Sequence, residues 1–205
     1  MTAEDYFITI AGPGRAQTRV LGSRFLGAAL SVSDEAEAAA CLEAERKQYY
    51  DATHWCHAFR IGTGGEPFEK GSDAGEPHGT AGQPILREIQ KRGLTQCLVI
   101  VTRYFGGTKL GTGRLARSYA ECAALALDAA TVVRRSLFAS CRVECPYEQQ
   151  NLVYLMANRH NAVIEAVPEA DRAVFRLSVA PSALTALVSA LTDSGNGRIH
   201  VSEAS

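Results

Sequence analysis

Two glycine-rich segments contain the residue types best suited to binding or chemistry in this chain. The first, Gly71–Gly82, contains Asp73, Glu76 and His78, whereas the second, Gly106–Gly113, is flanked by basic residues. Each segment precedes a predicted helix, and the free N–H groups at a helix N-terminus favour an anion. Glycine stabilises neither helices nor strands, so its concentration at two helix entrances indicates unusual backbone angles or the close approach of another group.

The second segment predicts a contact with phosphate or nucleic acid. Backbone amides and the dipole of the following helix would hold an oxyanion, and the basic side chains would neutralise it. The predicted contact residues are Arg103, Gly106, Gly107, Lys109, Gly111, Gly113, Arg114 and Arg117. The alternative is a tight strand-to-helix turn whose glycines serve backbone geometry and whose arginines are solvated. The segment lacks the Gly-Lys-Ser/Thr ending of the Walker phosphate loop.

Asp73, Glu76 and His78 form a second candidate site in an acidic loop. Two carboxylates and an imidazole could hold a divalent metal or share acid and base roles. No third strong ligand accompanies them, and short acidic segments rich in glycine and proline are usually turns. We therefore favour a plain loop and predict no metal.

The run His54-Trp55-Cys56-His57 is a third candidate. In a strand, His54 and Cys56 share one face and His57 points to the other. A Cys–His dyad could perform nucleophilic catalysis, but no flanking sequence typical of a cysteine protease surrounds it. Zinc would need four converging ligands. A structural role is favoured, and no catalytic residue is predicted.

The charges predict a local basic patch and not a uniformly basic chain. The formal net charge is −1 over 205 residues, which argues against coating of nucleic acid through bulk charge. From Arg87 to Arg117, however, seven basic residues stand against one acid, whereas Thr63–Leu86 has four acids and one lysine. A polyanion would therefore contact a local basic patch and not a uniformly basic surface.

Six cysteines without CxxC spacing indicate buried thiols in a reducing compartment. The sequence shows neither a charged and apolar leader nor an apolar run of membrane-spanning length. We expect a cytoplasmic protein without membrane contact.

Hydrophobic periodicity predicts an α+β fold with two domains, residues 1–134 and 135–205. In the first domain, the pair Asp34 and Glu37 predicts the start of one helix, and the pair Thr80 and Gln83 predicts the start of a second. The segment Cys97–Val101 is apolar at every position, which is typical of a central strand covered on both faces. Other strands are expected near residues 7–10, 18–32 and 54–61, and a further helix carries Leu115, Tyr119, Cys122 and Ala126 on one stripe.

The second domain is predicted to have the order β-α-β-β-α-β, which is the ferredoxin-like arrangement. Alternating apolar residues mark strands in 137–145 and 173–179, and Ser182 is expected to cap the last helix.

Three segments resemble the signatures of the Impact/YigZ family. They are Asp51–Ala58 (DATHWCHA), Ser72–Ile85 (SDAGEPHGTAGQPI) and Val101–Gly111 (VTRYFGGTKLG). They occur in order within a resemblance that covers about Gly22 to Ala130. Because the C-terminal domain also resembles the second domain of the bacterial members, the chain is identified as a bacterial two-domain member. The resemblance implies an Impact N-terminal-type domain like the second domain of ribosomal protein S five and domain four of elongation factor G. It also implies a ferredoxin-like C-terminal domain similar to domain five of that factor.

The chain departs from the family pattern at three positions. Ala74 stands where a second aspartate is usual, which weakens a metal site further. Trp55 replaces a usual asparagine, and Arg114 replaces a usual glycine and adds positive charge beside the second glycine segment.

In eukaryotes, members of this family regulate translation under amino-acid starvation by competing for a large activator of a translation-factor kinase. For bacterial members the resemblance implies a translation-related or RNA-binding role without an established reaction. The favoured hypothesis is a non-enzymatic binding module that needs no cofactor and contacts RNA, the ribosome or a translation-control protein. The alternatives are an enzyme that binds a phosphorylated small molecule at Gly106–Gly113, and a regulator that docks proteins through its C-terminal domain.

Overall fold

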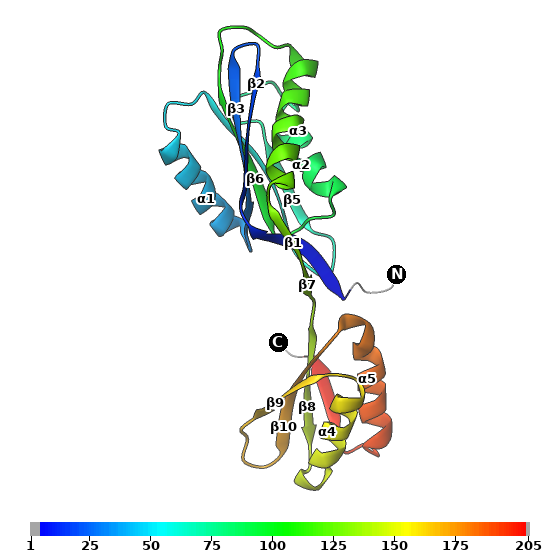
Figure 1. Cartoon of the computed structure of the whole chain (residues 1–205). Helices are drawn as coiled ribbons and strands as arrows, with labels where there is room; N and C mark the ends of the chain where they lie inside the picture. Colours follow the sequence, from blue (N-terminus) through cyan, green and yellow to red (C-terminus); the bar gives the residue numbers. More distant parts are fainter. Residues whose placement is uncertain (1–4, 204–205) are drawn as a thin grey trace. The chain divides into compact units, whose positions relative to one another are not determined.

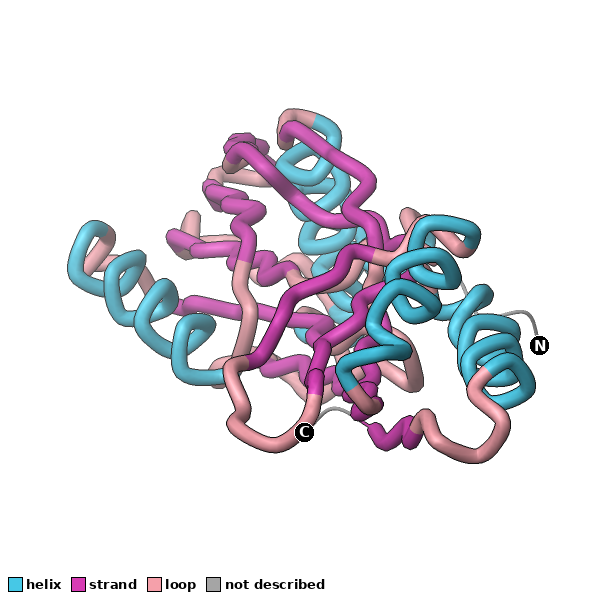
Figure 2. Tube along the Cα trace, turned by 90° about the horizontal axis from the view of Figure 1, so that it is seen from below, coloured by secondary structure: helices cyan, strands magenta, loops and turns pink. Residues whose placement is uncertain are grey.

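The computed structural model describes residues 5–203, which form two compact units with helices and strands in both (Figures 1 and 2). One unit is Phe7–Arg135, and the other joins the described residues before Phe7 to the segment that begins at Ser136. In chain order the elements are β1 (Tyr6–Gly12), β2 (Gly14–Val20), β3 (Ser23–Ser31), α1 (Glu35–Gln48), β4 (His54–Ile61), β5 (Phe68–Ser72), α2 (Gly82–Lys91), β6 (Cys97–Tyr104), α3 (Thr112–Asp128), β7 (Thr131–Ser136), β8 (Ala139–Cys145), η1 (Tyr147–Gln149), α4 (Gln150–Arg159), β9 (Val163–Val167), β10 (Ala173–Val179), α5 (Pro181–Ser194) and β11 (His200–Glu203).

The N-terminal unit contains a five-stranded sheet with the order β2-β3-β6-β4-β5. The central strand β6 pairs antiparallel with β3 on one side and β4 on the other. All of its residues except Tyr104 are buried, which confirms the predicted central strand and extends it beyond Val101. A separate two-stranded sheet joins β1 to β7.

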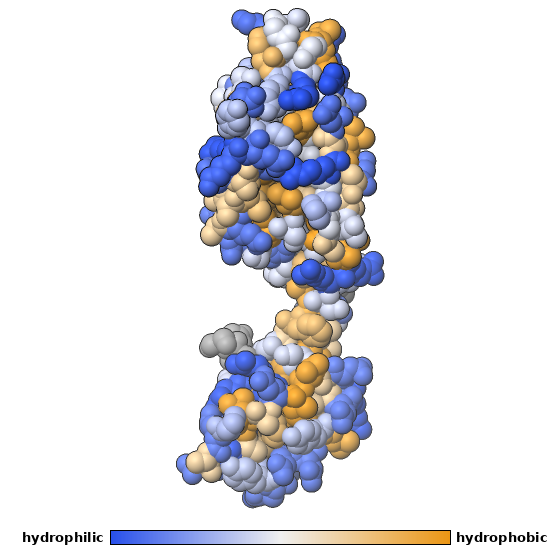
Figure 3. All heavy atoms as spheres, turned by 60° about the vertical axis from the view of Figure 1, so that its left-hand side comes forward, coloured by the Kyte–Doolittle hydropathy of each residue, from blue (hydrophilic) through white to orange (hydrophobic). Residues whose placement is uncertain are grey.

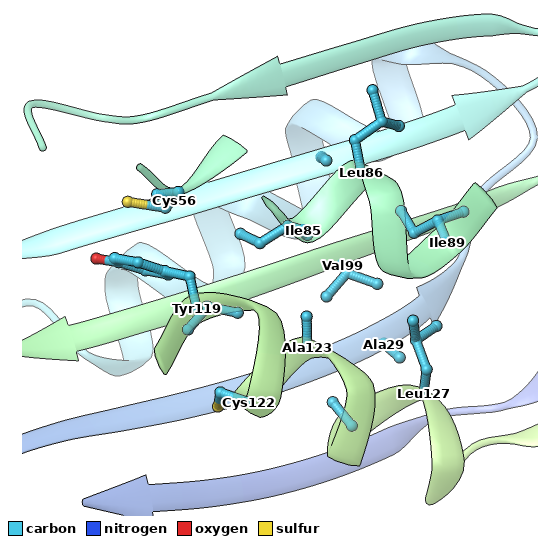
Figure 4. Close-up of a cluster of buried hydrophobic side chains, with 14 of the residues drawn as sticks. Ala29, Cys56, Ile85, Leu86, Ile89, Val99, Tyr119, Cys122, Ala123 and Leu127 are labelled. Carbon is cyan, nitrogen blue, oxygen red and sulfur yellow. The ribbon is translucent and has the colours of Figure 1, made fainter. Parts of the chain in front are cut away.

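The two faces of the five-stranded sheet are covered by different helices. Val99 and Val101 of β6 belong to the core beneath α2 and α3, whereas Leu98 and Ile100 belong to the smaller cluster beneath α1. Figure 4 shows side chains of α2 and α3 meeting above the strands, with the Tyr119 ring directed towards Cys56. Successive residues of a strand point to opposite faces of the sheet. A strand that is buried at successive positions therefore needs helices packed on both faces.

Helix α1 begins as predicted. The Asp34 carboxylate accepts a hydrogen bond from Glu37 N at 2.8 Å, and Glu37 Oε2 accepts one from Ser33 N at 2.7 Å. The predicted capping box of α2 is wrong, because its N-cap is Ala81 and the Thr80 hydroxyl donates to the carbonyl of Pro77.

The C-terminal unit has the predicted element order and a four-stranded sheet with the order β11-β8-β10-β9. All neighbouring strands pair antiparallel. Its core includes Val143, Val153, Phe175, Leu187 and Leu191 from strands and both helices.

The expected cap at Ser182 is wrong. The N-cap of α5 is Ala180, with Pro181 in the first turn. Ser182 instead donates its backbone N–H and its hydroxyl to the Asp5 carboxylate, at 2.9 and 2.6 Å. Over the described part of the chain, the helices are too short or too polar to cross a membrane.

Candidate functional site

The acidic loop is held in place by Asp73, whose carboxylate replaces the expected Thr80 cap at the start of α2. Oδ1 accepts hydrogen bonds from Ala81 N and Gly82 N, both at 2.9 Å, and Oδ2 accepts one from Gly79 N at 2.7 Å. Burial raises the pKa of Asp73, but the three amide hydrogen bonds outweigh it, so the pKa lies below its usual value. This carboxylate is therefore engaged in fixing the helix entrance.

Glu76 points inward and is paired with Arg103. Glu76 Oε1 accepts hydrogen bonds from Arg103 Nη1 at 2.5 Å and from the Tyr119 hydroxyl at 2.7 Å, and both charged side chains are 5% exposed. Arg103 Nη2 also donates to the Ser23 hydroxyl at 3.2 Å. Burial is the largest cause of a raised pKa at Tyr119, so its phenol remains protonated and donates to Glu76.

The histidine and cysteine of β4 attach to the same loop. His54 Nδ1 lies 2.9 Å from the carbonyl oxygen of Ala74, and because a carbonyl only accepts, Nδ1 carries the proton. Cys56 Sγ donates to the carbonyl oxygen of Asp73 at 2.9 Å, and burial raises the pKa of Cys56 to about 12. Both side chains lie on one face, as predicted, yet each binds the loop backbone instead of forming a dyad.

The remaining member of the predicted acidic site, His78, is exposed on the surface. Its Nδ1 lies 3.8 Å from Asp73 Oδ2, and its side chain is fully exposed to solvent. Within residues 5–203, no group of three or more His, Cys, Asp or Glu side chains has an arrangement that could hold a metal.

The second glycine segment packs directly against the turn between β2 and β3. A Cβ atom on Gly106 would lie 1.9 Å from the carbonyl carbon of Gly22 and 2.1 Å from Ser23 N. Gly106 N donates to the Ser23 hydroxyl at 3.1 Å. Glycine at 106 is therefore required by close packing of two backbones, and the segment is fixed at its first residue.

The same segment leads into α3 through Gly111, which has a φ of 74° and provides no side-chain cap. Gly107 also has a positive φ, of 84°, and a Cβ there would meet no atom within 4 Å. Gly113 lies in the first turn of the helix. The entrance of α3 therefore leaves its first amides without a side-chain acceptor, in contrast to the entrance of α2.

We call Lys109, Arg114 and Arg117 the basic loop surface. All three are exposed, and none of them has a hydrogen bond or an ion pair with any other described residue. The core-facing residues of the same helix turns are Leu115, Ser118 and Tyr119, whereas Arg114 and Arg117 are exposed. Within the described residues, these three cations are therefore unpaired.

The other cations of the basic segment differ in availability. Lys91 Nζ lies 2.5 Å from Glu88, and Arg92 contacts both Glu88 and Asp128. Only Arg87 of this helix is an exposed cation without an ion pair in the described chain. Arg103 is buried against Glu76, so it stands behind the surface and not on it.

The sequence interpretation did not single out a shallow depression beside Gly106. We call it the hairpin depression; its volume is about 400 Å³ and it is lined by Arg19, Val20, Leu21, Gly22, Arg24 and Tyr104. In a hairpin with a two-residue turn, residues equally distant from the turn pair with each other. This rule would have predicted the pairing of Arg19 with Arg24 from the sequence.

The chain belongs to the IMPACT family. The family model described as the Impact N-terminal domain matches residues 21–127. IMPACT family member YvyE from Bacillus subtilis is 30% identical over 96% of this chain and 90% of its own length. IMPACT family member YigZ from Escherichia coli is 36% identical over 68% of this chain and 69% of its own. A crystal structure described only as that of a hypothetical protein covers 98% of both chains with a TM-score of 0.71 and 25% identity.

Proposed function

We propose that this protein is a non-enzymatic binding module linked to translation, which contacts RNA phosphates through the basic loop surface. The observation that carries the proposal is the absence of any partner for Lys109, Arg114 and Arg117 among the described residues. Arg114 and Arg117 are three residues apart on one helix, where like charges repel. A bound polyanion would remove this repulsion, and phosphate contacts position a protein without reading sequence.

The acidic loop does not oppose this surface. Asp73 is taken up by three backbone amides, and Glu76 by Arg103 and Tyr119. Neither carboxylate has a hydrogen bond to Lys109 within residues 5–203. This arrangement supports binding over the alternative of an enzyme for phosphorylated small molecules, because the groups needed as base or metal ligand already have structural partners.

Family membership supports the link to translation, since the eukaryotic members that the motifs resemble regulate it. We further infer that the C-terminal unit is ferredoxin-like, because β-α-β-β-α-β order is combined with strand order β11-β8-β10-β9. We retain the second domain of ribosomal protein S five as the proposed analogue of the N-terminal unit. A cytoplasmic location belongs to the same proposal.

The test is co-sedimentation with ribosomes, together with binding to structured RNA over a salt series. The triple variant Lys109→Ala/Arg114→Ala/Arg117→Ala should bind more weakly, and its plot of log affinity against log salt should be flatter by about three units, one for each lost phosphate contact.

A matched control removes three exposed arginines of the C-terminal unit that have no ion pair in the described chain: Arg159→Ala/Arg172→Ala/Arg176→Ala. This variant loses the same charge and should keep the wild-type slope. If wild type fails to bind ribosomes and RNA at low salt, the proposed contact is wrong. Equal losses in both triple variants would reduce it to a nonspecific charge effect.

A further inference from the structure

The hairpin depression brings two arginines together without a carboxylate between them. Arg19 and Arg24 are direct partners in the antiparallel pairing of β2 with β3. Like charges placed opposite each other on neighbouring strands destabilise a sheet. Arg19 is exposed and has no hydrogen bond or ion pair in the described chain, so a site of unneutralised positive charge lies at the end of this hairpin.

Arg24 is held in a defined position by an aromatic ring. Its guanidinium carbon lies 4.2 Å from the centroid of the Tyr104 ring, and Tyr104 is its direct partner on β6. The Tyr104 hydroxyl donates a hydrogen bond to Asp51 at 2.7 Å. Asp51 therefore orients the ring and forms no ion pair with Arg24. A guanidinium fixed by stacking loses less conformational freedom when it binds an anion.

The backbone of the turn is strained at the same place. Leu21 has a φ of 45° and is 51% exposed, although bulky residues rarely adopt a positive φ. Gly22 follows with a φ of 81°, and its backbone is packed on Gly106. Strain of this kind tends to occur at binding sites, where the surrounding structure maintains it. Gly22, which lines the depression, therefore packs on the first residue of the second glycine segment.

We propose that the hairpin depression binds single-stranded RNA, with one backbone phosphate between Arg19 and Arg24 and the adjoining base stacked on the free face of the Arg24 guanidinium. Guanidinium groups suit phosphate oxygens because they donate two parallel hydrogen bonds. Unpaired RNA bases stack on arginine planes and aromatic rings. The volume of about 400 Å³ lies at the lower end of the range for small-ligand sites, which fits one nucleotide unit.

An extended strand is favoured over a free nucleotide because a second set of cations follows the point where the turn of the hairpin packs on Gly106. Gly22 lines the depression, and its backbone contacts Gly106, three residues before Lys109. Tyr104 lies on the α1 face of the sheet, like Leu98 and Ile100, so a strand whose phosphates occupy both surfaces would pass around the end of the hairpin and gain contacts that a mononucleotide lacks. The inference rests on the proposed RNA contact and adds to it the kind of RNA and a second group of contact residues.

The experiment measures anisotropy of a fluorescein-labelled 12-nucleotide oligouridylate over a salt series. Arg19→Ala/Arg24→Ala should bind about tenfold more weakly in low salt, which corresponds to one lost charge-assisted hydrogen-bonded contact, and its salt slope should fall by about one unit. Arg19→Lys/Arg24→Lys keeps the charge, so it should retain the slope and bind with intermediate affinity. The control Arg172→Ala/Arg176→Ala should match wild type.

The outcomes separate this inference from the proposed function. If the triple variant of the basic loop surface is impaired but Arg19→Ala/Arg24→Ala equals wild type, the hairpin site is wrong and the proposed function stands. Binding of ribosomes without binding of oligouridylate overturns only the single-strand assignment. Uridine monophosphate that competes at the affinity of the 12-mer also overturns the extended strand. If wild type binds neither ribosomes nor RNA, both proposals fail.

Discussion

Glu76 and Arg103 form a buried ion pair that joins two segments 27 residues apart in the sequence. Glu76 Oε1 lies 2.5 Å from Arg103 Nη1, and both side chains are 5% exposed. The pair fastens the acidic loop before α2 to the end of the central strand β6, directly ahead of the second glycine segment. The same carboxylate reaches α3 through the Tyr119 hydroxyl, so one acid holds together the elements that support the basic loop surface.

Glu76→Ala should strongly destabilise the N-terminal unit. Removing one member of a buried ion pair leaves the other charge uncompensated, and typically costs about 3–5 kcal/mol. Tyr119 would lose its acceptor as well. Urea unfolding followed by the fluorescence of Trp55, the single tryptophan of the chain, measures this loss because Trp55 lies in β4.

The control for this prediction is Glu43→Ala. Glu43 pairs with Arg46 at 2.7 Å, but the two side chains are 58% and 43% exposed, and such surface pairs contribute about 0–1 kcal/mol. Similar small losses in both variants would mean that the Glu76–Arg103 pair does not secure the loop.

Asp73 should make stability depend on pH in the acid range. Its folded pKa is lowered, so its contribution is fully present above the unfolded pKa of about 3.9 and is lost as pH falls towards the folded value. At pH 7, Asp73→Ala should lower the free energy of unfolding by about 1–2 kcal/mol, as for loss of a helix cap. The difference in the free energy of unfolding between wild type and Asp73→Ala should become smaller as the pH falls below about 3.9.

Urea midpoints at several pH values measure this gap, and Asp34→Ala serves as a comparison because Asp34 caps α1 with one hydrogen bond to Glu37 N. A gap at Asp73 that stays constant between pH 7 and pH 3 would contradict the assigned role of the ionised carboxylate.

The six free thiols should differ in reactivity. Cys41 is partly exposed and the other five are buried, and burial raises the pKa of both Cys56 and Cys97 to about 12. At pH 8 the thiolate is the reactive form, so DTNB should modify Cys41 first and all six thiols only after denaturation.

The variants Cys41→Ser and Cys56→Ser assign the fast phase of this reaction. Loss of the fast phase in Cys41→Ser is expected. Its loss in Cys56→Ser alone would show an accessible thiol beside His54 and would restore the Cys–His dyad as a candidate for chemistry.

The order of the main elements could be predicted because it depends on local periodicity. Burial along Cys97–Val101 and the Asp34 cap of α1 follow from neighbouring residues alone. The entrance of α2 could not be predicted in the same way, since Asp73 reaches it from outside the helix and displaces the local Thr80 cap. Long-range contacts of this kind leave no spacing pattern in the sequence.

Part of the candidate site could also be predicted from the sequence, and part could not. Lys109, Arg114 and Arg117 are exposed as a basic segment would suggest, but Arg103 carries an equal charge and is buried. Arg103 is buried because it pairs with Glu76. The inward orientation of Glu76 depends on the tertiary structure and cannot be read from the local sequence. Strand β5 was not predicted, because Phe68–Ser72 is largely polar and is an edge strand held by pairing with β4.

Gly106→Ala should disturb the contact between the second glycine segment and the β2–β3 turn. A Cβ would lie 1.9 Å from the carbonyl carbon of Gly22, and backbone atoms cannot move aside as the end of a side chain can. We expect a loss of about 1–3 kcal/mol in the free energy of unfolding, typical of overpacking. Gly65→Ala is the control, because a Cβ there meets nothing within 4 Å, and it should change stability by less than about 0.5 kcal/mol. Urea unfolding read by Trp55 fluorescence compares the two, and equal stability would mean that the segment does not depend on the turn for its position.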